Sequence, residues 1–186
     1  SRHSGPTSTA APPCGRALST LQPHGPYLPD LTAPTVQVTS PASKAEYAAY
    51  FELRWRLLRA PWNQPRGSEQ DDRETDSIHI MAITKQAAVA GVGRLHFNSI
   101  SEAQIRYMAV STSHQRQGIG TLILTALEDR ARQLGASIIV LNARETALGF
   151  YTRHGYTPTG PGEMLYNRIA HVRMQRPLTG SHPVRT

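Results

Sequence analysis

The chain contains a single cysteine, Cys14, among its 186 residues. One thiol excludes an internal disulfide and any metal site built from several cysteines. Cys14 lies in a stretch rich in proline, glycine and serine, where no predicted element would hold a reactive thiol in place. The eight histidines are scattered, and their spacing indicates no set of metal ligands. We therefore expect neither a cysteine nucleophile nor a bound metal.

Long apolar runs are also missing. A membrane-spanning helix needs ~20 predominantly apolar residues, and the longest runs here are pieces such as Ile138–Leu141. We expect a protein without a membrane partner, located in the cytoplasm.

Basic runs are absent although the formal net charge is +7. No stretch rich in lysine and arginine alternates with aromatic residues, as is typical of nucleic-acid-binding proteins. Nucleic acid is therefore not an expected partner, whereas a small ligand that carries several phosphates suits the basic excess.

The first 34 residues have few charges and no apolar periodicity. Eight of the 14 prolines lie between Pro6 and Pro41, and Asp30 is the one acidic residue before Glu46. Such a segment buries too little apolar surface to offset the entropy of ordering it. We predict a disordered or extended tail over 1–34, a domain over 35–178 and a short tail over 179–186. Two arginines give an organelle transit peptide only weak support.

Regular patterns begin at residue 35. Ser43 and Glu46 have the spacing of a capping box, which predicts a helix to about Arg59 with Tyr50 among its buried residues. Residues 62–76 are polar and indicate a loop or short helix. Alternation predicts strands over 35–39, 78–84, 87–97 and 103–110, the last three as an antiparallel meander.

The second half reads strand–helix–strand. An amphipathic helix is predicted over 118–134 and is ended by Gly135. A buried strand over 137–142 and a short helix over 147–154 follow, and 156–159 and 170–176 are the last strands. This order predicts an α/β fold with a crossover connection.

The segment from Tyr107 to Thr121 indicates an anion site. A helix start exposes unpaired N–H groups with partial positive charge, and Gly118 and Gly120 remove side chains that would keep a ligand away. Arg116 adds charge and the Thr121 hydroxyl adds a donor, so the turn suits a diphosphate. The alternative is a tight turn in which glycine only relieves crowding.

Two nucleotide motifs do not fit this turn. No Lys-Ser or Lys-Thr follows the glycines, so it is not a Walker loop. Ile123 stands where a dinucleotide-binding turn has its third glycine.

Two blocks in order carry a family resemblance. Gln-x-x-Gly-x-Gly at 115–120, directly after a strand ending Met108-Ala109-Val110, resembles the acyl-CoA motif of the GNAT superfamily of N-acetyltransferases. Residues 141–156, with Phe150-Tyr151 and Gly155-Tyr156, resemble the second motif of that superfamily. Two further segments, Arg94-Leu95 and 102–110, resemble those of one GNAT subgroup. In that subgroup the domain stands alone or is joined to a thioesterase-like half. The resemblance covers roughly 35–176.

This resemblance implies a fold and a binding mode. The fold would be a mixed, mostly antiparallel sheet of about six or seven strands, flanked by about four helices, with a splayed central strand pair. The pantetheine arm of acetyl-CoA would lie in the splay, with Asn142 facing it and backbone N–H near Ala109 or Val110 polarising the acyl carbonyl. The implied cofactor-binding residues are Met108, Ala109, Val110, Gln115, Arg116, Gln117, Gly118, Ile119, Gly120, Thr121, Asn142 and Tyr151.

The resemblance also implies catalytic roles. Tyr151 would be the general acid that donates to or shares a proton with the departing thiolate, although a core tyrosine would look the same. Gln104 stands where some members carry a glutamate base, and an amide is not a base. Glu102 lies two residues earlier on the same strand face and is our candidate base. Other options are His96, Glu69 and His79.

The predicted function is transfer of an acetyl group from acetyl-CoA to an amine by direct attack in a ternary complex. The alternative is a non-catalytic acyl-CoA-binding module, which Gln104 favours. The acceptor amine would bind near Trp62–Asp76 and the strand pair after Tyr156, but no recognition motif identifies it. A homodimer is compatible with the family.

Overall fold

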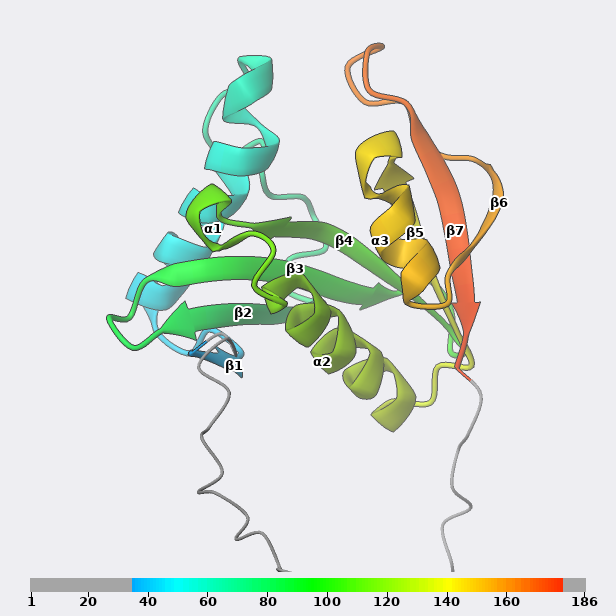
Figure 1. Cartoon of the computed structure of the whole chain (residues 1–186), viewed down its shortest axis with the longest axis horizontal. Coiled ribbons are helices and arrows are strands. Elements are labelled where there is room, and N and C mark those ends of the chain that lie inside the picture. The colour runs from blue at the N-terminus through cyan, green and yellow to red at the C-terminus, as the bar shows by residue number, and fades with distance from the viewer. Residues whose placement is uncertain (1–34, 179–186) are drawn as a thin grey trace, which may run out of the picture. The chain divides into compact units, whose positions relative to one another are not determined.

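The computed structural model describes residues 35–178, which form one seven-stranded sheet (Figure 1). The predicted tails at 1–34 and 179–186 lie outside the described residues. The strand order is β1-β2-β3-β4-β5-β7-β6, and every neighbouring pair is antiparallel except β4 and β5. The strands are β1 (Val36–Thr39), β2 (Ile78–Thr84), β3 (Val89–Phe97), β4 (Glu102–Val110), β5 (Ile138–Arg144), β6 (Thr157–Pro161) and β7 (His171–Pro177).

The described residues contain three α-helices, where about four helices were expected. They are α1 (Lys44–Leu58), α2 (Ile119–Gln133) and α3 (Leu148–Arg153), and the shorter 3₁₀ turns are η1 (Ala60–Trp62), η2 (Thr112–His114) and η3 (Glu145–Ala147). After η1, residues 63–77 form successive turns, and the Ser68 and Glu69 carbonyl groups within them accept hydrogen bonds from Arg59 and Arg54. None of these helices has both the length and the apolar character needed to cross a bilayer.

The capping box at the start of α1 is confirmed. The Ser43 hydroxyl accepts from the Glu46 amide at 3.1 Å, and the Glu46 carboxylate accepts from the Ser43 amide at 2.9 Å. Tyr50 is fully buried as expected, but the buried side of α1 also includes Arg54, which an apolar pattern does not reveal.

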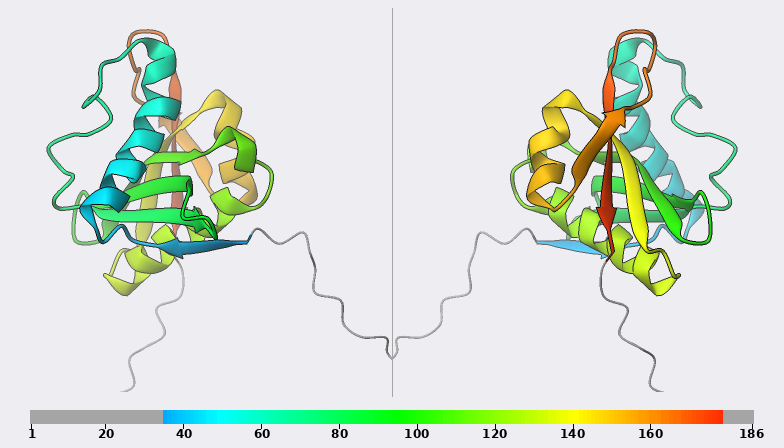
Figure 2. Two further views of the ribbon diagram at one scale, coloured as in Figure 1. Left: turned by 90° about the vertical axis from the view of Figure 1, so that its left-hand side faces the viewer. Right: turned by 90° about the vertical axis from the view of Figure 1, so that its right-hand side faces the viewer.

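The two long helices cover opposite faces of the sheet (Figure 2). Alternate residues of β2 point to opposite faces. Met81 packs with Tyr50 of α1, whereas Ile80 packs in the larger core with Ile123 of α2. The sheet is therefore covered by a helix on each face, α1 on one side and α2 on the other.

Glycine lets α2 approach β3 closely. A Cβ atom on Gly91 would lie 2.6 Å from Cδ1 of Ile123, and one on Gly93 would lie 2.8 Å from Cδ1 of Leu127. Real Cβ atoms do not approach so near. The absence of a side chain at these two glycines therefore allows α2 to pack this close to β3.

The central strands β4 and β5 separate after a short parallel pairing. Their register runs from Glu102 opposite Ile138 to Ile105 opposite Leu141, and beyond that point each strand pairs only with its other neighbour. A bulge in β4 accompanies the separation: Tyr107 has a φ of 55°, and the register with β3 shifts between Val92 and Arg94. A bulge bends the strand and increases its twist. The expected splayed pair is therefore confirmed.

Candidate active site

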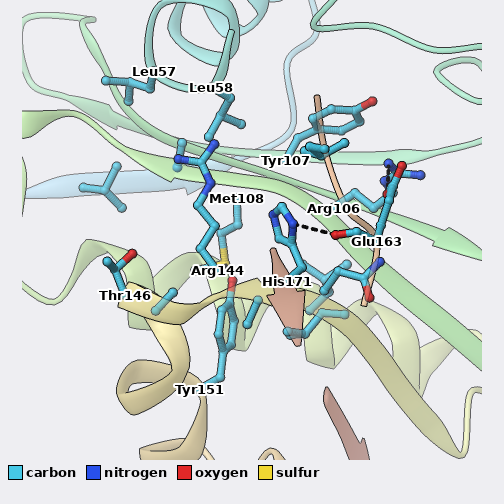
Figure 3. A pocket seen from close by; sticks show the side chains of 18 of the residues that line it. Leu57, Leu58, Arg106, Tyr107, Met108, Arg144, Thr146, Tyr151, Glu163 and His171 are labelled. Atoms are coloured by element: carbon cyan, nitrogen blue, oxygen red, sulfur yellow. Dashed lines mark hydrogen bonds and ion pairs between the residues drawn. The ribbon is translucent and has the colours of Figure 1, made fainter. Parts of the chain in front are cut away.

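The splay between β4 and β5 contains a cavity of about 320 Å³ (Figure 3). Its walls come from the end of α1, the bulged half of β4, the end of β5 with η3 and α3, and the segment joining β6 to β7. The polar and sulfur-containing residues that line it include Arg59, Arg106, Met108, Gln115, Asn142, Arg144, Tyr151, Glu163 and His171.

The bulge decides which part of β4 faces the cavity and the core. Ala103 and Ile105 pack in the core that contains α2, and so does Met108, three residues after Ile105. Without the extra residue at the bulge, Met108 would point to the opposite face. Ala109 packs on the α1 side instead. Met108, Ala109 and Val110 all line the cavity, as the sequence predicted for residues along the cofactor arm.

The bulge is held in place by a buried ionic network. The Tyr107 hydroxyl donates to Asp71 at 3.1 Å, and the Arg94 guanidinium donates to Asp71 at 2.9 Å and to Glu74 at 2.8 Å. The Arg54 guanidinium lies 3.8 Å from the centre of the Tyr107 ring and also pairs with Glu74. Both arginine side chains are fully buried. The network fastens residues 71–74 to β3 and β4, beside the cavity.

The charges of this network control the protonation of its members. Burial on its own raises the pKa of Asp71, but hydrogen bonds and positive charge from Arg94 outweigh it and hold that pKa well below its ordinary value. Burial, followed by the charge of Arg94, lowers the pKa of His96 to about 4. His96 is therefore neutral at physiological pH, bonded to Asn98 at 3.1 Å.

Tyr151 of α3 reaches into the cavity from below in Figure 3. Its side chain is 8% exposed, and its hydroxyl donates to the Met108 sulfur at 3.6 Å. The rings of Phe150 and Tyr156 pack edge-on against it, with centroids 5.1 Å and 5.7 Å away. Burial raises the pKa of Tyr151 to about 12, so the phenol keeps its proton at all ordinary pH values.

The predicted anion turn leads into α2 with free amides. Arg116 has a φ of 61° and Gly118, the N-cap of α2, has a φ of 78°. No side chain caps this helix among the described residues, so its first N–H groups remain available. Such alternation of backbone conformations before a helix start forms a concave anion site.

Two residues of this turn behave differently from the expectation. A Cβ atom on Gly120 would face the Phe150 ring of α3 at 3.4 Å, an ordinary contact distance, and would not point toward the turn. The Thr121 hydroxyl lies 3.1 Å from Nε2 of His154, whose Nδ1 lies 2.8 Å from the Phe150 carbonyl. A carbonyl only accepts, so Nδ1 carries the proton and Thr121 donates to Nε2. Its hydroxyl proton is thus already used.

The other predicted binding residues lie in and beside the cavity. Gln115 lines it and donates to the Val110 carbonyl at 3.4 Å, and Asn142 lines it at the point where β5 leaves β4. Gln117 donates to Ser113 at 3.2 Å, outside the cavity. The Ile119 side chain is buried in the core, which leaves only its backbone N–H for a ligand.

Glu102 is not brought to the cavity. Its carboxylate accepts from Asn98 at 2.8 Å and from Arg173 at 3.4 Å, at the end of β4 opposite Met108. Six residues of strand amount to ~20 Å, which separates the backbone of Glu102 from that of Met108, the residue that Tyr151 contacts. Gln104, His96, Glu69 and His79 are likewise absent from the cavity walls.

His171, the first residue of β7, is a cavity residue that the sequence analysis did not select. Its Nδ1 lies 2.9 Å from the Glu163 carbonyl and 3.1 Å from the Ile169 carbonyl. Two acceptors on one nitrogen place the proton on Nδ1, so Nε2 carries the lone pair in the neutral ring. No hydrogen bond to Nε2 occurs within residues 35–178. Glu163 lines the same cavity, paired with Arg106 at 3.2 Å.

No local sequence pattern identifies His171 or Glu163 as a residue of the cavity. The segment that joins β6 to β7 has no apolar period, and a single histidine at a strand start is common on protein surfaces. Only the antiparallel return of β7 beside β5 carries His171 to the splay.

Comparisons with known proteins agree with this geometry. Residues 47–156 match the model of the acetyltransferase (GNAT) family. The Bacillus subtilis protein described as uncharacterized N-acetyltransferase YjcF is 32% identical over 126 residues, which cover 68% of this chain and 89% of that protein.

Solved structures share the fold. An acyl-CoA N-acyltransferase from Pseudomonas aeruginosa superposes with a TM-score of 0.65 at 20% identity, covering 76% of this chain and 99% of the other. An aminoglycoside 6'-N-acetyltransferase complexed with coenzyme A superposes with a TM-score of 0.67 at 14% identity, covering 78% and 98%. The fold, the cavity in the splay and the family match lead to one conclusion: this chain belongs to the GNAT family and is an acetyl-CoA-dependent N-acetyltransferase.

Proposed function

We propose that the cavity between β4 and β5 is where this enzyme brings acetyl-CoA and its amine acceptor together. The proposal depends on one observation: the two strands separate at Ile105 and Leu141, and the opening is walled by Met108 on one side and Tyr151 on the other. A pantetheine arm pairs its amides with Met108–Val110 like an added strand. Its diphosphate rests on the N–H groups between Gln115 and Thr121, with Arg116 beside them.

The reaction is acyl transfer without a covalent enzyme intermediate. The acceptor nitrogen attacks the thioester carbonyl carbon, the C–N bond forms, and the C–S bond breaks. The sulfur leaves as a thiolate that ends as the thiol of coenzyme A, and the nitrogen loses one proton. Backbone N–H near Ala109 or Val110 stabilises the negative oxygen of the intermediate.

Tyr151 assists the departure of the thiolate. A free thiol has a pKa of about 8.5, and the phenol, with a pKa of about 12, gives up its proton less readily. Complete transfer to sulfur is therefore unfavourable, and a shared hydrogen bond to the sulfur is the better description. The Met108 thioether, a weak acceptor, holds the hydroxyl in the direction from which it can serve a stronger one.

His171 accepts the proton from the attacking amine. Its Nε2 lone pair is not used within the described chain, and the two carbonyls on Nδ1 hold the tautomer that makes Nε2 basic. This assignment replaces Glu102, which lies outside the cavity. It also weakens the support for the non-catalytic alternative, because that alternative depended on a missing base at Gln104.

The test is steady-state kinetics of thiol release for His171→Ala, with calorimetry of acetyl-CoA binding. We expect the rate to fall by about 10²- to 10⁴-fold, the acetyl-CoA affinity to stay within about twofold, and added imidazole to restore part of the rate. A variant as active as the wild type would remove His171 from the mechanism. Absence of acetyl-CoA binding to the wild type would contradict the whole assignment of the cavity.

A further inference from the structure

Arginine dominates the charge of the cavity. Three arginines line it, and Glu163 is the one acidic residue among the lining residues. Arg106 pairs with Glu163 at 3.2 Å. Arg59 and Arg144 form no ion pair within residues 35–178, so this cavity carries two guanidinium charges without a protein counter-ion.

The two guanidinium groups lie near each other at the end of the cavity formed by α1. Arg59 directly follows α1, and its side chain is held by the Ser68 carbonyl at 2.8 Å and the Leu58 carbonyl at 3.2 Å. Arg144, the last residue of β5, extends across the cavity toward Leu58 (Figure 3). Burial, and then the positive charge of Arg59, lowers the pKa of Arg144. A guanidinium group keeps its positive charge at neutral pH even when it is buried in a protein.

Donors remain free at this point. Arg59 donates from Nε and Nη1 to its two carbonyl acceptors, and its Nη2 donates to no acceptor in the described part of the chain. No nitrogen of Arg144 donates a hydrogen bond there either. Two like charges, partly removed from water and without an anionic partner among residues 35–178, are costly unless a ligand supplies negative charge.

The expected anion of the cofactor lies elsewhere. The diphosphate turn begins at Gln115, has its own arginine at Arg116, and contributes only Gln115 to the cavity walls. Arg59 and Arg144 instead adjoin aromatic rings of the segments around the predicted acceptor region: Trp62 lies 5.9 Å from the Arg144 guanidinium and Tyr166 lies 5.9 Å from that of Arg59.

We propose that the acceptor is a small amine that also carries a carboxylate, and that Arg59 and Arg144 bind this carboxylate while the amine faces the thioester. The inference rests on the proposed function, since it names the acceptor of that same site. Guanidinium groups bind carboxylates through paired charge-assisted hydrogen bonds. A cavity of about 320 Å³ that also admits the thioester leaves room for an acceptor of amino-acid size.

The experiment compares matched acceptors. Amino acids of different length are each paired with their amide and with the aminophosphonate of the same length, and thiol release from acetyl-CoA gives kcat/KM. The variants are Arg144→Gln and Arg144→Lys, with Arg130→Gln on the exposed side of α2 as the control. Arg144 is chosen because Arg59 also holds the chain after α1, so its removal would disturb the fold.

We expect the best acid to exceed its amide by at least about tenfold in kcat/KM. Arg144→Gln loses this preference, because its kcat/KM for the acid falls by about tenfold more than its kcat/KM for the amide, and the KM of acetyl-CoA is unchanged. Arg144→Lys retains part of the preference, and Arg130→Gln behaves as the wild type.

Three results would overturn the inference: amides used as well as acids, aminophosphonates preferred over carboxylates, or an Arg144→Gln effect on the KM of acetyl-CoA alone. If only amines without a carboxylate are acetylated, the proposed function stands, but the inference that the acceptor carries a carboxylate is wrong. If no amine releases thiol, calorimetry with the coenzyme A-bound enzyme decides. An acid that binds no better than its amide then overturns the inference, and tighter binding of the acid supports it.

Discussion

The hydroxyl of Tyr151 lies 3.6 Å from the sulfur of Met108, across the opening between α3 and β4. The two residues belong to two separate motifs of the chain, 43 positions apart. A thioether is a weak acceptor, so this contact directs the phenol into the cavity without holding it strongly. The relationship places a protonated donor beside the position that we propose for the reacting sulfur.

Replacing Tyr151 with phenylalanine removes the donor and keeps the ring. We expect kcat to fall by about 10²- to 10⁴-fold, because the departing thiolate loses its hydrogen bond. The acetyl-CoA affinity should change by less than about twofold, since the cofactor contacts proposed above are mainly backbone. Tyr47→Phe, on the partly exposed side of α1, is the matched control and should retain full activity. Equal kcat in both variants would assign Tyr151 to packing alone.

The pH dependence gives a separate check on the same residue. The protonated phenol is the active form, so its contribution is present below the pKa of about 12 and is lost only as the pH rises through that value. No limb of the wild-type pH–rate profile between about pH 6 and 10 should then come from Tyr151. Tyr151→Phe should lower the profile without changing its shape. A wild-type alkaline limb that disappears in the variant would contradict the buried, protonated state.

Asp71→Asn tests the ionic network behind the bulge. Asp71 pairs with buried Arg94, so its loss leaves an incompletely compensated charge, and we expect a loss of about 3 kcal/mol in unfolding free energy at pH 7. The folded-state pKa of Asp71 is depressed, so its stabilisation is present above the unfolded pKa of about 3.9 and is lost as the pH falls below it. Urea unfolding at pH 7 and pH 3 measures both effects.

The neighbouring Asp72 provides the control for that experiment, because it is exposed. Asp72→Asn should stay within about 0.5 kcal/mol of the wild type and keep its pH dependence. Asp71→Asn should show a flatter acid response than the wild type. An unchanged acid response in Asp71→Asn would mean that other carboxylates dominate.

Gly118→Ala tests the turn before α2. Gly118 has a φ of 78°, where an alanine costs about 1–2 kcal/mol. We expect that loss of stability together with several-fold weaker acetyl-CoA binding, because relaxation of the turn moves the amides that face the diphosphate. Gly149→Ala is the matched control: its Cβ would meet Arg153 at an ordinary 3.7 Å inside α3, so it should be neutral or slightly stabilising. Weaker binding in Gly149→Ala alone would move the diphosphate site away from the turn.

The elements with strong local patterns could be predicted from the sequence. The capping box of Ser43 and Glu46 starts α1, and Gly118 stands at the N-cap of α2, because caps depend on residues three or four positions apart. The predicted strands and their meander are present within a residue or two. The two motifs around Gly118 and Tyr151 located the splay through the family resemblance.

The proposed base, His171, could not be predicted in this way. Strand alternation placed Glu102 and Gln104 on one face, but it did not reveal the bulge at Tyr107 or how far along β4 the cavity begins. The sequence alone would place Arg54 on the exposed surface of its helix, although it is buried. Its acidic partner Glu74 lies 20 positions away, so no local spacing indicates the pair. The sequence likewise predicts a free hydroxyl donor at Thr121, because its hydrogen-bond partner His154 is 33 positions away.

The sequence by itself determined where helices and strands begin, the glycine turn before α2 and the family of the chain, because each depends on residues close together along the backbone. Tertiary structure alone decided which side chains share the cavity. Strand register, one extra residue in β4 and the return of β7 bring Tyr151, His171, Arg59 and Arg144 together from four separate segments. Register is set by the packing of the whole sheet, and no local spacing encodes it.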